Sequence, residues 1–123
     1  MGLPEIKNDN IEQYLNKKDI IKQTVEQIKK DFGMFGIKIK FSGKIDQAYI
    51  ELHHQLTEQV TTLFGNDYGR LLSVLYQVDI SEKEILKTHS ELVHYSYPEV
   101  IAHQIIVRDL KKVLTRQYFK AKS

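Results

Sequence analysis

The sequence contains no cysteine among its 123 residues. Disulfide bonds, thiolate metal ligands and cysteine nucleophiles are therefore excluded together. A chain of this length can bury a hydrophobic core without such links, and we expect a cytoplasmic protein because the composition suits a reducing compartment. No stretch approaches the roughly 20 apolar residues of a membrane span. Residues 1–10, MGLPEIKNDN, also lack the apolar run of a signal peptide.

Motifs of common enzyme chemistries are missing as well. The segment Gly33–Gly36 lacks the length and the following Lys-Ser/Thr of a phosphate-binding loop. No serine lies in a Gly-x-Ser-x-Gly elbow. The neighbouring carboxylates of Glu82 and Glu84 belong to a predicted first helical turn, where negative charge is favourable. The sequence therefore indicates no catalytic residue and no cofactor.

Charge is nearly balanced over the chain but unevenly distributed along it. The net charge is +2, yet residues 1–45 carry +3 (9 basic, 6 acidic), residues 46–99 carry −6 (3 basic, 9 acidic) and residues 100–123 carry +5 (6 basic, 1 acidic). We expect opposite patches to face one another, either within the fold or between copies of the chain. A dedicated nucleic-acid-binding protein would more often be basic throughout.

Apolar spacing predicts a mainly α protein, a compact bundle of four to five helices in a single domain over residues 1–123, with residues 1–9 flexible. The first helix is expected to begin at Asp9 or Asn10 and to run to Phe32, with Gly33 as its stop. Lys17 and Lys18 interrupt its apolar stripe and leave room for a break, after which Asp19 would cap a shorter second helix. The other helices are expected over residues 44–64, 68–78, 82–95 and 98–119.

Polar residues at helix starts strengthen these boundaries. Asp67 is predicted to cap one helix. Ser81 and Glu84, like Ser96 and Glu99, have the spacing of a capping box, in which each side chain bonds a backbone NH of the other residue.

One segment, residues 36–42, has the period of a strand. Ile37, Ile39 and Phe41 alternate with polar residues. A lone strand leaves backbone groups unpaired. The segment must therefore pair with a symmetry mate, pair with a short unrecognised strand, or lie as an extended segment on helices.

The longest predicted helix, residues 98–119, has two distinct faces. Its core stripe consists of Val100, His103, Val107, Leu110, Leu114 and Tyr118. Its other face is basic with apolar residues among the cations, which indicates a partner surface or a second buried side. The predicted partner-binding residues are Ile101, Ile105, Arg108, Lys112, Arg116 and Phe119.

Two histidines and two sequence motifs are candidate functional sites. His89 and His103 fall on inward stripes, where a core histidine hydrogen-bonded to a neighbour is the favoured interpretation over a ligand or base. The Glu-x-x-His pairs Glu51/His54 and Glu91/His94 have the spacing of di-iron ligands. Both pairs are predicted to point at solvent, so we predict no metal site, although a metal-binding bundle is kept as an alternative.

Two stretches of the chain are similar to known proteins. They are LLSVLYQVDISEKEI, residues 71–85, and VIAHQIIVRDLKKVLTRQYF, residues 100–119. There the chain resembles small uncharacterised bacterial proteins of similar length. The resemblance implies a single helical domain and carries no function or catalytic residue.

These observations together favour a non-enzymatic module that oligomerises or binds a protein partner, with a homodimer as the simplest form. The segregated charges, the unpaired strand and the apolar residues on a basic face would all be explained by such an interface. Binding of nucleic acid or another polyanion through the basic C-terminal helix is the alternative function. Its contacts would come from Arg108, Lys111, Lys112, Arg116, Lys120 and Lys122.

Overall fold

The computed structural model describes residues 17–122, and the predicted starts at Asp9 or Asn10 and the flexible residues 1–9 lie outside this range. The described chain is mainly α-helical, as predicted, and has no β-strand. Its helices are α2 (Lys18–Gly33), α3 (Ala48–Asn66), α4 (Tyr68–Val78), α5 (Glu82–Glu91) and α6 (Tyr97–Lys122), with a 3₁₀ turn η1 (Ile45–Gln47) before α3.

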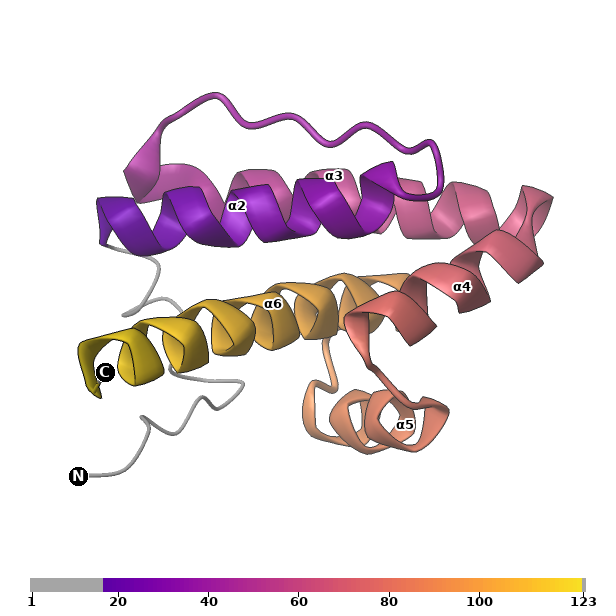
Figure 1. The fold of residues 1–123 in the computed structure, drawn as a ribbon. Helices are drawn as coiled ribbons and strands as arrows, with labels where there is room; N and C mark the ends of the chain where they lie inside the picture. Colours follow the sequence, from indigo (N-terminus) through magenta and orange to yellow (C-terminus); the bar gives the residue numbers. More distant parts are fainter. Residues whose placement is uncertain (1–16, 123) are drawn as a thin grey trace.

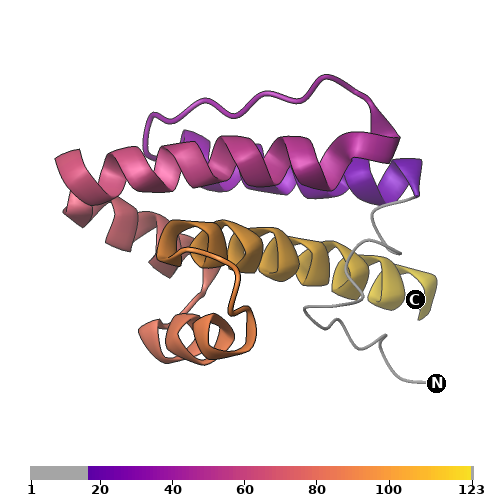
Figure 2. The same cartoon turned by 180° about the vertical axis from the view of Figure 1, so that it is seen from behind.

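Helix α6 is the centre of the bundle (Figure 1). Helices α2 and α3 lie side by side along one side of it, α5 packs on the opposite side, and α4 leads from the end of α3 back toward α6 (Figures 1 and 2). Every residue from Val100 to Val107 is buried, because α6 is covered from more than one direction. The predicted stripe is therefore in the core from Val100 to Leu114, and Tyr118 is half-buried.

Helix α2 begins and ends for different reasons. Lys17 precedes it with an extended backbone and no side-chain capping bond, so the expected cap at Asp19 is wrong. The Asp19 carboxylate lies in the first turn, where it complements the positive helix end. The predicted stop at Gly33 is confirmed. Gly36 follows with φ of +76°, a left-handed conformation that glycine adopts without steric cost.

The predicted caps of the later helices are confirmed. The Asp67 carboxylate accepts from the Arg70 amide at 3.1 Å, and the Ser81 hydroxyl accepts from the Glu84 amide at 3.2 Å. The Ser96 capping box is reciprocal, since the Ser96 amide donates to Glu99 Oε1 at 2.9 Å and the Glu99 amide to Ser96 Oγ at 3.3 Å. This box fixes the start of the central helix.

Helix α5 differs from its predicted extent. It ends at Glu91 instead of near Tyr95, because Leu92 has left the helical conformation. Its buried residues are Ile85 and Thr88, and Thr88 Oγ1 accepts a bond from the Gln104 amide group of α6. The prediction that His89 faces the core is wrong, because α5 turns its Thr88 side toward α6 and leaves His89 exposed.

The extended segment of residues 37–44 lies along α3. Ile37 and Ile39 are buried and Lys38 and Lys40 are exposed, as the alternation predicts. Its backbone forms hydrogen bonds with side chains of α3 and pairs with no strand of the described chain. Gln55 donates to the Lys40 carbonyl at 2.7 Å and accepts from the Lys40 amide at 2.8 Å. The third alternative, an extended segment on helices, is therefore correct.

Candidate functional site

The predicted partner-binding residues of α6 do not share one surface. Ile101 and Ile105 are buried within this chain, 1% and 0% exposed, so they form the second buried side. The physical reason is the central position of α6, which leaves this face covered by the chain's own helices. Phe119, near the end of α6, is 60% exposed and is the apolar member of the set that reaches solvent.

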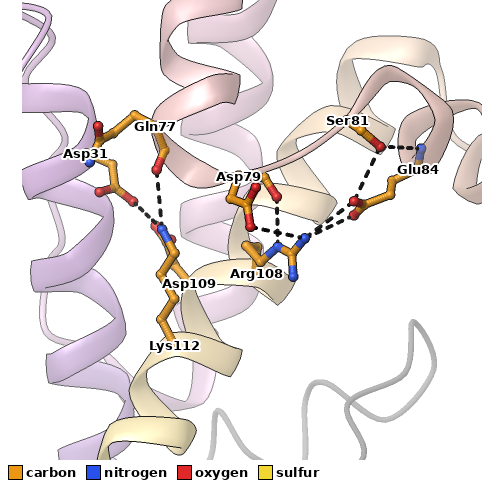
Figure 3. A network of polar contacts seen from close by, with 8 residues as sticks. All are labelled: Asp31, Gln77, Asp79, Ser81, Glu84, Arg108, Asp109 and Lys112. Carbon is orange, nitrogen blue, oxygen red and sulfur yellow. Dashed lines mark hydrogen bonds and ion pairs between the residues drawn. The ribbon is translucent and has the colours of Figure 1, made fainter.

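The predicted cations contact groups within the fold. Arg108 Nε donates to the Asp79 carbonyl at 3.0 Å, and its Nη2 lies 3.4 Å from Glu84 Oε2 (Figure 3). Arg116 Nη2 donates to Gln27 Oε1 at 2.8 Å. Arg108 thus joins the basic C-terminal helix to the acidic middle of the chain, as the charge pattern predicts for facing patches.

Lys112 lies against a pair of buried aspartates (Figure 3). Its Nζ is 3.8 Å from Asp31 Oδ2 and 3.5 Å from Asp109 Oδ1, and both carboxylates are completely buried. It also donates to the Gln77 carbonyl at 3.5 Å, so α2, α4 and α6 meet at one ammonium group. Our sequence reasoning missed this cluster. The available signal was the inward spacing of the acids, with Asp31 three residues after Ile28 and Asp109 three after Ile106.

The two buried aspartates favour the binding of one proton. Burial, and next the neighbouring Asp31 carboxylate, raise the pKa of Asp109 to about 8, although Lys112 acts in the opposite direction. Asp31 Oδ2 and both Asp109 oxygens have no conventional hydrogen-bond donor among the described residues. A protonated Asp109 can donate to Asp31, so one shared proton removes the repulsion between two buried carboxylates.

His103 lies in a second polar cluster. It is 2% exposed, and its Nδ1 is 2.6 Å from the Tyr49 hydroxyl, which is 3.2 Å from the Tyr95 hydroxyl. Burial, and then electrostatic repulsion from the nearby His53 ring, lower the pKa of His103 to about 4, so the ring is neutral at pH 7. The interpretation of His103 as a hydrogen-bonded core histidine is confirmed.

The Glu-x-x-His motifs form no ligand set in the described chain. His54 Nε2 pairs with Glu58 at 2.9 Å and its side chain is 75% exposed, whereas Glu51 turns to the Ser42 amide at 2.8 Å. His94 and Glu91 are exposed. Across residues 17–122 no three His, Asp or Glu side chains gather in a way that could hold a metal ion.

A surface groove lies between α4, α5 and α6, with a volume of about 210 Å³. Its lining consists mainly of aliphatic and aromatic side chains, three of them tyrosines, and Glu82 is its one charged residue. The lining residues are Phe64, Tyr68, Leu71, Leu72, Leu75, Tyr76, Ile80, Glu82, Ile85, Tyr97 and Ile101. We call this feature the α4 groove.

The rim of the α4 groove is an exposed stripe of α4. Tyr68, Leu72 and Tyr76 are 51%, 49% and 88% exposed and recur every four residues, so they share one face of the helix. The single charged residue of α4, Arg70, pairs with Asp67 at 3.2 Å. Our sequence reasoning gave the bounds and the cap of this helix and did not recognise this exposed face. The Tyr68–Leu72–Tyr76 spacing was the signal for a second apolar face.

Glu82 stands beside an aromatic wall at the groove. The Phe64 ring contacts those of Tyr68 and Tyr97 at centroid distances of 5.2 and 5.9 Å. Burial, followed by the electrostatic effects of Glu82 and then Tyr68, raises the pKa of Tyr97. Within the described chain the Glu82 carboxylate has no ion-pair partner, whereas Glu84 in the same turn pairs with Arg108. An unpaired negative charge therefore borders an apolar surface.

Comparison with known proteins yields no match among family models, curated proteins or solved structures. In the part of the chain that the structure describes, every helix is too short or too polar to cross a membrane.

Proposed function

We propose that this protein is a non-enzymatic helical module that self-associates through the α4 groove and its rim. The observation that carries the proposal is the exposed face of α4, where Tyr68, Leu72 and Tyr76 lie in a row without an intervening charge. Contiguous apolar patches of this kind mark interaction sites on soluble proteins. The absence of cysteine is consistent with such a module working in the cytoplasm.

The size of the groove supports a protein occupant. At about 210 Å³ it is smaller than the roughly 300–1,000 Å³ of typical small-molecule sites. Interfaces instead use pockets of this kind for single aromatic or aliphatic anchors. A stable dimer buries about 1,200–2,000 Å² in total, so surface beyond the groove and its rim must contribute as well.

The polyanion alternative is weakened by the contacts of the basic helix. Arg108 is engaged by Asp79 and Glu84, and Lys112 by two buried aspartates. These two cations would have to leave ion pairs before they could contact phosphates. The described surface of α6 thus carries less available positive charge than its sequence indicates.

The test of self-association is the mass of the protein in solution. We expect light scattering across the micromolar range to give about twice 14.4 kDa for the unmodified chain. Leu72→Glu should reduce the mass to that of a monomer, because it places a charge in the centre of the apolar rim. Ile50→Glu, a matched change at a 69% exposed position of α3 outside the groove, should leave the dimer intact. A monomeric unmodified chain would overturn the proposal.

A further inference from the structure

We infer that the α4 groove of one copy is filled by the C-terminal turn of α6 from a second copy, with Phe119 as the apolar anchor and the basic residues beside it facing Glu82. This inference rests on the proposed self-association and names the segment that performs it. The partner copy would then complete a surface that each chain leaves open.

The end of α6 has the chemistry that the groove lacks. Phe119 is 60% exposed, although a ring of this size gains most from burial. It lies between Arg116 and Lys120, and no acidic residue follows Asp109 in the sequence. The last turns of α6 are therefore apolar and positive. The groove is apolar and negative, because Glu82 is its one charged lining residue.

The positions of the α4 groove and of the end of α6 suit a closed two-fold dimer. The groove includes Tyr97 and Ile101 from the first turns of α6, whereas Phe119 lies in its last turns. The 22 residue-to-residue steps from Tyr97 to Phe119 span roughly 33 Å of helix. Two α6 helices that run antiparallel bring the end of each to the start of the other. Each copy then inserts the last turn of its α6 into the partner's α4 groove and binds the partner's last turn in its own groove, as a two-fold axis requires.

A different contact could use the same rim. Two α4 helices could pack on each other about Leu72, with Tyr68 of each chain against Tyr76 of the other, because the spacing is symmetric. Such a pair buries the rim but leaves Phe119 and Glu82 without a role. The charge complementarity between the groove and the end of α6 favours reciprocal insertion of the α6 ends, which we call the exchange. The experiment below distinguishes the exchange from the pairing of two α4 helices.

The experiment is a complementation test by sedimentation, with one chain carrying a fluorescent label. The groove variant is Leu72→Glu and the tail variant is Phe119→Glu, both at exposed positions where the fold tolerates charge. Each alone should be monomeric. Mixed, they should form a heterodimer, because the intact tail of one fits the intact groove of the other. Met34→Glu, at another exposed apolar residue, should remain a homodimer.

A charge variant tests the role of Glu82 separately. Exposed ion pairs contribute about 0.2–1 kcal/mol each, and the two-fold dimer contains two of them, so Glu82→Gln should weaken the dimer by about two- to thirtyfold. Helical circular dichroism like that of the unmodified chain shows that each variant is folded.

The outcomes distinguish the two proposals. A monomeric unmodified chain overturns both of them. A dimer that survives Phe119→Glu but dissociates with Leu72→Glu supports self-association and overturns the exchange. Failure of the mixed variants to associate also overturns the exchange. Masses above a dimer would contradict its two-fold closure.

Discussion

Asp31 and Asp109 occupy inward positions of α2 and α6 where the helical period otherwise places apolar side chains. The pattern alone could show that these positions face inward. It could not show that two acids from distant parts of the chain meet, because that depends on how α2 is aligned with α6. The same limit explains His103, whose burial was predictable but whose partner Tyr49, 54 residues away, was not.

Asp109→Asn tests the shared proton. The folded-state pKa of Asp109, about 8, lies above its ordinary 3.8. The folded state therefore holds a proton that the unfolded state releases, and stability falls as pH rises from about 4 to about 8. Asparagine stays neutral and can donate to Asp31. Between pH 6.5 and 8.5 we expect the unmodified chain to lose about 2 kcal/mol from this group and the variant to lose little.

Urea unfolding at the two pH values measures this difference. Asp46→Asn, at an exposed acid of η1, is the control and should lose as much unfolding free energy between the two pH values as the unmodified chain. An equal loss in the Asp109→Asn variant would show that Asp109 is ionised in the folded state at neutral pH.

At the scale of elements, local signals were predictable and long-range partners were not. The caps at Asp67, Ser81 and Ser96 depend on residues three positions apart, so the sequence contains the whole interaction. The alternating burial of residues 37–41 was also predictable. Its backbone partner is a side chain on α3, Gln55, which no strand pattern indicates.

Gln55→Ala should release the extended segment from α3. The substitution removes both hydrogen bonds between the Gln55 amide group and the Lys40 backbone. We expect faster hydrogen exchange of the Lys40 amide and a loss of about 1 kcal/mol in the free energy of unfolding. Gln59→Ala, one turn along α3, is the matched control and should leave that amide protected. Unchanged exchange in the Gln55 variant would show that packing of Ile37 and Ile39 alone holds the segment.

At the scale of the whole molecule, two buried groups act on stability in opposite directions. The pKa of His103 is about 4 in the fold, below its ordinary 6.5, so the unfolded state takes up a proton first on acidification. Stability from this group is therefore lost as pH falls from about 6.5 to about 4. Asp109 has the reverse effect over the same range, and continues to lower stability up to about pH 8.

The opposition predicts a characteristic pH profile. We expect the urea midpoint to change little between about pH 4.5 and 6.5 and to fall between 6.5 and 8, because in the upper range Asp109 still holds a proton in the folded state that it has lost in the unfolded state, whereas His103 is largely neutral in both states. In the Asp109→Asn variant the urea midpoint should rise with pH between about pH 4.5 and 6.5, because Asp109 then no longer offsets the effect of His103. A flat lower range in that background would mean that His103 is not neutral in the fold.

The cluster of Asp31, Asp109 and Lys112 also bears on how the helices find their alignment. Apolar stripes such as those of α2 and α6 can slide by one turn, about 5.4 Å, and still meet apolar side chains. The same slide would separate two buried carboxylates from Lys112 and from each other, leaving charge unpaired in the core, which is strongly destabilising. Leucines in these places would pack in several registers. We therefore expect the polar cluster to contribute little to stability in the observed register and to make the neighbouring registers far less stable.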